Sequence, residues 1–338
     1  MAASDPASSA VPLVDLRDFR AADPARRAAF VQELGAAIQA LGFVRVQGHG
    51  LHPEVMGPAY AAARAFFHRP EAEKLRYYVA GGAGERGYTP FGFEHARDQP
   101  TPDLKEFWHV GRELPQGHPL ARVYPRNLWP AEVPAFRPAM LRVYQELEAT
   151  SEILLEALAL YLGEPIDTFT GLCREGNTIL RPIHYPPIAG EHYIPGAIRA
   201  AQHEDINFIT LLMSSTSAGL ELLTREGRWM AANALPGEIL ADTGDMMSRV
   251  SNGVLPATTH RVVNPEDGNS DRLSMPFFVH PRPDAVLRVL DRFRGPGFPP
   301  PAPDITGRGF LRQRLREIGL LDEETEEVDH DGASHRGG

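Results

Sequence analysis

Three residues, His203, Asp205 and His260, have the chemical types and the spacing of a facial metal site. A set of two histidines and one carboxylate holds Fe(II) on one face and leaves the other coordination positions open for O2 and an organic co-substrate. His203 and Asp205 are two residues apart in a run that predicts a β-strand, so we expect their side chains on one face, with Glu204 pointing away. The sequence therefore indicates a candidate Fe(II) site formed by these three side chains.

Arg272 and Ser274 form a second constellation, in a later β-rich run. The same alternation places both side chains on one face of the strand. An arginine offers a planar, two-pronged donor for a carboxylate and a serine adds a further donor, which suits the far end of a dicarboxylate. A His-x-Asp pair alone is a weak signal, because a single histidine in a half-buried strand is usually a hydrogen-bonded core residue. The pair, the third ligand and the Arg-x-Ser motif together form a specific pattern.

Further motifs extend this pattern in a fixed order along the chain. The most informative are Val11–Leu16, Gly42–Leu51, Phe66–Phe67, Arg86–Pro90, Asp103–Phe107, Gly219–Glu221, Gly244–Asp245, Asn252–Gly253 and Pro276–Phe278. Together with the triad they resemble the isopenicillin N synthase-like family of non-haem iron oxygenases, most of whose members use 2-oxoglutarate. The resemblance covers roughly residues 10 to 315.

The resemblance implies an α+β fold in which a double-stranded β-helix, or jelly roll, is flanked by helices. It implies Fe(II) as cofactor, held by the triad, with 2-oxoglutarate and O2 as co-substrates. The carboxylate of 2-oxoglutarate that lies away from the iron would meet Arg272 and Ser274, and Tyr185 matches a family tyrosine near the same carboxylate. The activity expected is the hydroxylation, desaturation or cyclisation of a small organic substrate, with release of succinate and CO2.

The resemblance also places N-terminal loops and the C-terminal helix at the mouth of the barrel, where the primary substrate would bind. The candidate pocket residues are Tyr88, Phe91, Phe93, Phe107, Trp108, Arg181, Phe310 and Arg314. For each aromatic residue the competing interpretation is that the ring packs a loop onto the barrel. Arg181 is expected on the strand that leads to Tyr185, facing either the pocket or solvent.

Departures from the family pattern leave alternatives open. Many members have Asn-x-Tyr where this chain has Ile183–Tyr185, and Asn where it has Asp242 before Gly244–Asp245. The run His203–Leu212 is also closer to isopenicillin N synthase itself, which uses its Arg-x-Ser pair for a substrate carboxylate and needs no 2-oxo acid. An iron oxidase of that kind, or an ethylene-forming type of oxygenase, is therefore an alternative function.

Two further classes fit less well. A zinc hydrolase would more often show a compact motif such as His-Glu-x-x-His, which this chain lacks. A metal-dependent binding protein without turnover would not need the complete triad together with an anion clamp. Enzyme function is the better interpretation.

Composition favours an enzyme that acts on small molecules. The 338 residues are 43% hydrophobic, enough for a substantial core, and the net charge of −10 without a basic stripe argues against nucleic acid as a partner. Cys173 is the lone cysteine, so no intramolecular disulfide framework is expected. The sequence shows no apolar run of transmembrane length and no secretory signal pattern, so we expect a cytoplasmic protein without a membrane partner.

The chain changes character once along its length. Helical periodicity and end signals predict helices over residues 24–41, 53–68 and 135–162, with a short strand at 43–46. Residues 178–280 instead form short β-rich runs separated by turn signals, as in a sandwich or barrel.

We therefore divide the chain into three parts. Residues 1–130 form an N-terminal helical and loop region. Residues 131–320 hold the long helix, the jelly-roll oxygenase core and the C-terminal helix, and residues 321–338 form an acidic tail that is predicted to be disordered.

Overall fold

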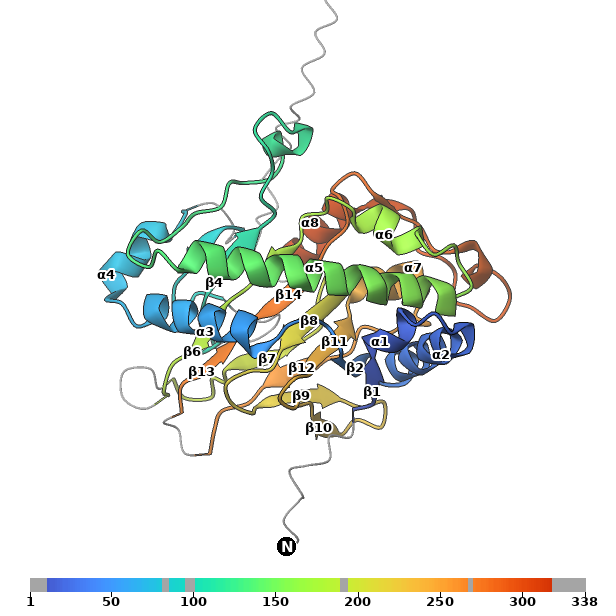
Figure 1. The fold of residues 1–338 in the computed structure, drawn as a ribbon, viewed down its shortest axis with the longest axis horizontal. Coiled ribbons are helices and arrows are strands. Elements are labelled where there is room, and N and C mark those ends of the chain that lie inside the picture. The colour runs from blue at the N-terminus through green and yellow to red at the C-terminus, as the bar shows by residue number, and fades with distance from the viewer. Residues whose placement is uncertain (1–10, 81–84, 95–100, 189–193, 267–269, 318–338) are drawn as a thin grey trace, which may run out of the picture.

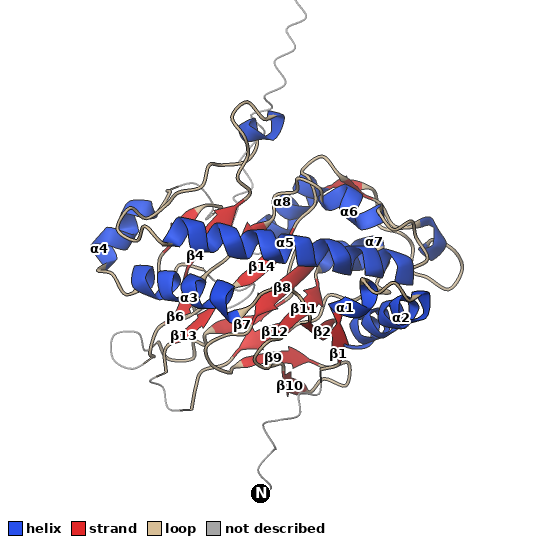
Figure 2. Ribbon diagram, viewed as in Figure 1, coloured by secondary structure: helices blue, strands red, loops and turns tan. Residues whose placement is uncertain are grey.

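The structure of the chain is a computed structural model. It describes residues 11–80, 85–94, 101–188, 194–266 and 270–317. The tail predicted at the C-terminus lies outside the described residues. Helices pack over one side of a large β-sheet, and most of the strands lie together beneath them (Figure 1, Figure 2).

The helices include the three that the sequence predicted, now α2, α3 and α5. The α-helices of the described chain are α1 (Leu16–Phe19), α2 (Pro24–Leu41), α3 (Pro53–Phe67), α4 (Glu71–Lys74), α5 (Phe136–Tyr161), α6 (Thr168–Cys173), α7 (Asp245–Val250) and α8 (Gly307–Glu317), and the short 3-10 helices are η1 (Leu75–Tyr77), η2 (Pro119–Arg122) and η4 (Asp291–Phe293). Helix α2 begins after Asp23, whose carboxylate accepts a hydrogen bond from the Ala25 amide. It ends at Gly42, whose φ of 69° is a left-handed conformation that glycine adopts without strain.

The strands are short, as the spacing of the turn signals indicated. They are β1 (Leu13–Asp15), β2 (Phe43–Gln47), β3 (Gly87–Thr89), β4 (Glu106–Gly111), β5 (Ile179–Leu180), β6 (Ile183–Tyr185), β7 (Ala200–His203), β8 (Ile209–Met213), β9 (Leu220–Leu223), β10 (Trp229–Ala231), β11 (Ile239–Thr243), β12 (His260–Val262), β13 (Arg272–Ser274), β14 (Pro276–Val279), β15 (Val286–Leu287) and β16 (Ile305–Thr306).

Two sheets enclose a shared core. In the described residues the larger sheet has ten strands, in the order β1-β2-β11-β8-β14-β5-β4-β6-β13 with β3 added beside β4, and the smaller has four, β10-β9-β12-β7. Strands β15 and β16 form a separate pair. Side chains of both sheets, among them Phe43, Leu222, Leu240 and Val262, pack into one inner hydrophobic cluster. This arrangement is the jelly roll that the resemblance implied.

Strand β8 shows how the larger sheet faces two environments. Leu211 and Met213 are buried in the core beneath the helices, whereas Thr210 and Leu212 face a cavity between the sheets. The alternation follows from the two-residue period of a strand. Side chains on the inward face can therefore take part in chemistry, while those on the outward face pack against the helices.

The long helix α5 covers the outward face of the larger sheet (Figure 1). Its apolar stripe, including Met140, Leu147 and Leu154, is buried in the same core as the outward side chains of the sheet. Tyr144 meets Phe277 of β14 edge-on, with ring centroids 4.9 Å apart. The helix predicted over residues 135–162 thus packs its apolar stripe in the core. No described helix, α5 included, is both long and apolar enough to span a membrane.

The N-terminal region contributes strands to the jelly-roll sheet. Strand β2 pairs with β11, with Val46 opposite Ile239, and β4 pairs with both β5 and β6. The two regions on either side of the predicted boundary near residue 130 therefore share one sheet.

Candidate active site

The three candidate ligands converge on one point. His203 ends strand β7, His260 begins strand β12, and the two are directly opposite each other in these paired strands. Oδ1 of Asp205 lies 3.9 Å from Nε2 of each histidine. The two imidazole centroids are 4.5 Å apart. The fold thus brings together the side chains that the sequence singled out.

Main-chain carbonyl groups orient both imidazoles. Nδ1 of His203 lies 2.7 Å from the carbonyl oxygen of Ala201, and Nδ1 of His260 lies 3.1 Å from that of Thr258. Because a carbonyl oxygen only accepts, each ring carries its proton on Nδ1 and presents the lone pair of Nε2 toward Asp205. Metal-binding histidines are usually oriented by hydrogen bonds of this kind. Two neutral imidazoles and one carboxylate are a donor set that fits Fe(II).

Asp205 is held in place although it lies beyond the strand. Strand β7 ends at His203, so the expectation that both ligands lie on one strand is wrong. The Thr210 hydroxyl donates to Oδ2 of Asp205, and the Asp245 amide donates to its carbonyl oxygen at 2.7 Å. These bonds engage Oδ2 and leave Oδ1 directed toward the histidines.

A second carboxyl group lies in the same cavity. Asp242 of β11 is 4% exposed, and burial followed by the charge of Asp205 raises its pKa well above the usual range. Burial and then the neighbouring His260 lower the pKa of His203. Before any cation enters, the cavity therefore favours a neutral imidazole at His203 and a neutral acid at Asp242.

The predicted anion clamp lies on β13 and its neighbour β6. Tyr185 is directly opposite Arg272, and the guanidinium carbon of Arg272 lies 4.8 Å from the tyrosine ring centre. Arg272 is 1% exposed, and its Nε donates to the Ser217 carbonyl at 3.1 Å. Nη1 is also buried, and no described residue accepts a hydrogen bond from it. A buried donor without an acceptor is costly, so an anionic ligand such as the carboxylate of a 2-oxo acid fits this position.

The triad and the clamp line one cavity between the sheets. Its described walls are Phe43, Lys105, Arg181, Ile183, Tyr185, Ala200, His203, Asp205, Thr210, Leu212, Leu220, Asp242, His260, Val262, Arg272, Ser274, Pro276 and Phe278. An ion at the triad and an anion at the clamp would thus share one enclosed space.

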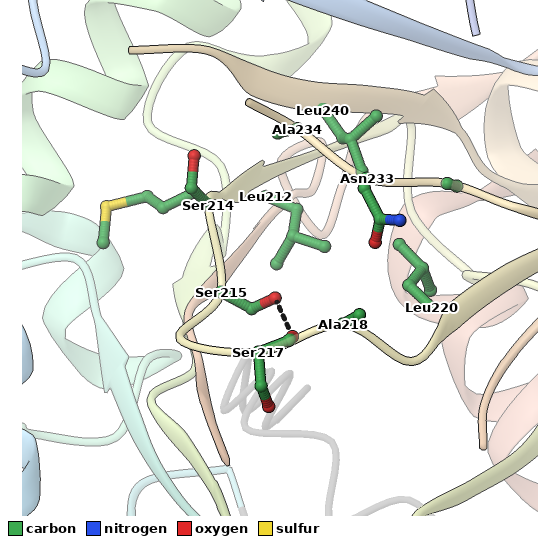
Figure 3. A pocket seen from close by; sticks show the side chains of 11 residues that line it. Leu212, Ser214, Ser215, Ser217, Ala218, Leu220, Asn233, Ala234 and Leu240 are labelled. Carbon is green, nitrogen blue, oxygen red and sulfur yellow. Dashed lines mark hydrogen bonds between the residues drawn. The ribbon is translucent and has the colours of Figure 1, made fainter. Parts of the chain in front are cut away.

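A second cavity, of about 220 Å³, is drawn in Figure 3. Its walls are uncharged, and Leu212 and Leu220 line both cavities. The Ser215 hydroxyl donates to the Ser217 carbonyl at 2.8 Å, the same carbonyl that holds Arg272. Because uncharged walls offer little for metal or acid–base chemistry, we place the chemistry in the first cavity.

One of the candidate substrate residues lines the triad cavity, and another lies against it. Arg181 lines it, with its guanidinium carbon 4.5 Å from the ring centre of Phe107 and 4.9 Å from that of Phe278. Phe107 belongs to the inner cluster. Tyr88 and Trp108 lie instead in the core beneath the helices, which argues against both as pocket residues.

The remaining candidates also lie elsewhere. Phe310 is buried in the helical core, and Arg314 pairs with Asp245 of α7 at 2.8 Å. Phe91 packs against a small separate cluster, and Phe93 is 52% exposed. None of these four is among the residues that line the triad cavity in the described chain.

Sequence reasoning missed Lys105, Thr210 and Asp242 as parts of the cavity. Lys105 is buried, with Nζ 2.6 Å from Glu94 and 2.8 Å from Asp103. A charged residue inside an apolar run requires a partner or a role, and this was the available signal for Asp242. A threonine two residues into an apolar strand gives no comparable signal.

Two family models match the chain. The N-terminal model described as non-haem dioxygenase in morphine synthesis covers residues 11–132, and the model of the 2OG-Fe(II) oxygenase superfamily covers residues 176–281. The second match contains all three triad residues and the clamp.

Individual proteins agree with these models. The chain is 31% identical to the proline hydroxylase buaE of Petromyces alliaceus, over 82% of this chain and 89% of that protein. A solved 2OG-Fe(II) oxygenase family protein from Caulobacter crescentus is 41% identical, with a TM-score of 0.82 over 92% of this chain and 100% of the other. A Neurospora crassa protein, solved in complex with alpha-KG and thymine, is 25% identical, with a TM-score of 0.80 over 92% and 98% of the two chains.

Proposed function

This chain belongs to the isopenicillin N synthase-like family of 2OG-Fe(II) oxygenases, and we therefore propose that His203, Asp205 and His260 hold its iron. The orientation of the two imidazoles supports this assignment, because both Nε2 lone pairs face Oδ1 of Asp205. Three protein ligands on one face leave positions for 2-oxoglutarate and O2 on the other.

The protein is an Fe(II)- and 2-oxoglutarate-dependent dioxygenase that oxidises a small organic substrate with O2 and releases succinate and CO2. When bound, Fe(II) activates O2, and the decarboxylation of 2-oxoglutarate to succinate supplies two of the four electrons that O2 takes up. Relatives of the chain carry the names of 2-oxoglutarate enzymes, which favours this activity over the iron oxidase alternative.

We assign the binding of 2-oxoglutarate to Arg272, Ser274 and Tyr185. The single observation that carries this assignment is the buried Nη1 of Arg272, for which the described chain offers no acceptor. A carboxylate there would receive charge-assisted hydrogen bonds in a water-poor site, where such bonds are strongest. Arg272 and Ser274 are thus expected to fix the far end of the co-substrate and so to set the position of its near end at the triad.

We propose a polar primary substrate. Three charged or acidic side chains, Lys105, Arg181 and Asp242, line the cavity together with the triad and the clamp. An apolar molecule could form no hydrogen bond with these groups, whereas a molecule with its own donors and acceptors could. The proline hydroxylase and the thymine-bound Neurospora crassa protein among the relatives act on or bind polar molecules.

Succinate formation tests these assignments together. Purified enzyme would receive Fe(II), 2-oxoglutarate, O2 and a panel of small polar compounds such as L-proline and thymine. We expect succinate to form in step with O2 consumption, and we expect the His260→Ala variant to form none. O2 consumption without 2-oxoglutarate would restore the oxidase alternative, and full succinate formation by His260→Ala would overturn the ligand assignment.

A further inference from the structure

A second cluster of potential metal ligands lies outside the triad cavity. His68 follows helix α3, His184 lies on β6, and Asp271 immediately precedes β13. One ligand atom from each lies within 4.8 Å of the others. Because His184 precedes Tyr185 and Asp271 precedes Arg272, two residues of this outer cluster are direct chain neighbours of clamp residues.

The His184 imidazole is oriented in the way that is usual for metal-binding histidines. It is 5% exposed, and its Nδ1 lies 2.7 Å from Oε1 of Glu106. Glu106 is held in turn by the Lys74 ammonium and by the Tyr88 hydroxyl. A carboxylate that fixes one imidazole nitrogen and leaves the other for a metal is the arrangement typical of protein metal sites.

The free side of His184 meets the carboxylate of Asp271. Nε2 of His184 lies 3.0 Å from Oδ1 of Asp271, and both atoms are buried. Nε2 of His68 lies 3.5 Å from Oδ2 of Asp271. Two imidazole nitrogens and a carboxylate this close together can bind one cation once the nitrogens are unprotonated.

His68, the third residue of the cluster, makes the cluster accessible from solvent. The His68 side chain is 51% exposed, and its ring meets that of His184 at 5.4 Å between centroids. On its other side the His184 ring stacks on Phe67, with centroids 5.5 Å apart and planes 21° apart. A rigid buried histidine, an aspartate and an exposed histidine form a site that an ion can enter without unfolding the protein.

We propose that His68, His184 and Asp271 bind a divalent transition-metal ion of the zinc class. Two imidazoles and one carboxylate, with a water in the remaining position, are an established ligand set for Zn²⁺. The ion would be held on the outside of the strands that carry the clamp and would be distinct from the iron at the triad.

Two other cations compete for this position. The Arg64 guanidinium pairs with Oδ2 of Asp271, which leaves Oδ1 for a metal. Burial lowers the pKa of His184, but Asp271 and Glu106 outweigh burial and raise it overall, so a metal ion competes with a proton for Nε2.

The test counts tightly bound zinc in untagged, full-length protein that has been stripped with a chelator. Zn²⁺ would be titrated against a chromophoric chelator in the wild type, His203→Ala, His68→Ala and the double variant. Since zinc also binds iron-type ligand sets, we expect two equivalents in the wild type, one in each single variant and none in the double variant. His52→Ala removes an exposed histidine at the other end of α3 and is the matched control, for which we expect two.

A second readout distinguishes the two sites. In the His203→Ala background, Co²⁺ should give a visible d–d absorption that disappears in His203→Ala/His68→Ala. The proposal is overturned if His203→Ala binds no zinc, or if the double variant keeps the equivalent that His203→Ala retains. Failure of the triad assignment would differ, because His203→Ala would then bind as many equivalents as the wild type.

Discussion

Two clusters of the same composition, each with two histidines and one aspartate, lie in different parts of this protein, and their surroundings differ. At the triad, main-chain carbonyls hold Nδ1 of both histidines and a neutral hydroxyl, that of Thr210, holds Asp205. At the outer cluster, the carboxylate of Glu106 holds His184, and the Arg64 guanidinium holds Asp271. The triad is thus built from neutral contacts around a cavity, and the outer cluster from an ion-pair network.

The difference indicates what each cluster contributes. Neutral contacts leave the triad's charge available to a metal and its co-substrate, so its loss should cost activity rather than stability. A partly buried ion-pair network joins α3, β4, β6 and β13, so its loss should cost stability even when no metal is bound. Substitutions in each cluster and in the clamp can separate these two roles.

The largest effect is expected for His203→Ala. Removal of one of three ligands should reduce 2-oxoglutarate-dependent succinate formation to background. The free energy of unfolding of the metal-free protein, measured with urea, should change by no more than about 0.5 kcal/mol, because the side chain is 37% exposed. A large loss of stability would show that the triad also holds the fold together.

The second-largest effect is expected for Arg272→Ala, which should weaken the binding of 2-oxoglutarate. Truncation of one partner of a buried charge pair costs about 2–5 kcal/mol, which corresponds to a rise of at least about 30-fold in the apparent KM for 2-oxoglutarate. Arg272→Lys keeps the charge but loses the planar, two-pronged guanidinium, so its apparent KM should lie between those of the wild type and Arg272→Ala. An unchanged KM in Arg272→Ala would remove this residue from the clamp.

Thr210→Val should weaken iron binding without touching a ligand. The valine keeps the shape of the side chain but removes the hydrogen bond to Oδ2 of Asp205. Loss of such an orienting bond typically lowers metal affinity about 10- to 100-fold. Fe(II) titration monitored by activity would measure it, and Thr210→Ser, which keeps the hydroxyl, should behave like the wild type.

Asp271→Asn should give the opposite profile, a loss of stability with little loss of activity. Burial opposes ionisation of Asp271, but His184 and Arg64 outweigh it and lower its pKa to about 2. Because this pKa is lower in the folded state than the unfolded value near 4, the stabilisation is present above about pH 4 and is lost as the pH falls toward about 2. Allowing for partial exposure, we expect a loss of about 1–2 kcal/mol at pH 7 in metal-free protein.

Urea unfolding of the wild type and Asp271→Asn between pH 7 and pH 3, in the presence of a chelator, measures this effect. The gap between the two proteins should narrow as the pH falls below about 4. A gap that stays constant over this range would contradict the electrostatic origin of the stabilisation.

The triad could be predicted from its residue types and spacing, and the clamp because chemistry and strand period act together. Arg272 and Ser274 share a face as the period of two requires, and Tyr185 lies opposite Arg272. The same period could have corrected one pocket prediction: Phe107 and Trp108 are successive residues of β4, so they face opposite sides, and only Phe107 is inside.

The features that could not be predicted from the sequence depend on how distant segments pack against each other. Phe310 and Arg314 lie four residues apart on one face of α8, and both are engaged with α7, through Arg249 and Asp245. No local pattern states which helix face meets which neighbour. The place of Asp205 beyond the end of β7 was equally hidden, because the strand's end depends on pairing with β12.

The proposed mechanism depends above all on iron held by His203, Asp205 and His260, with an open face toward 2-oxoglutarate. This state can be examined directly by adding Fe(II) and 2-oxoglutarate to the purified protein without O2. The visible spectrum is then recorded, because a 2-oxo acid chelated to such an iron site produces a weak charge-transfer band. We predict the band in the wild type and in His68→Ala, and its absence in His203→Ala. A band of full strength in His203→Ala would show that these three residues do not form the iron site, and its absence from iron-loaded wild type would show that 2-oxoglutarate does not chelate the iron.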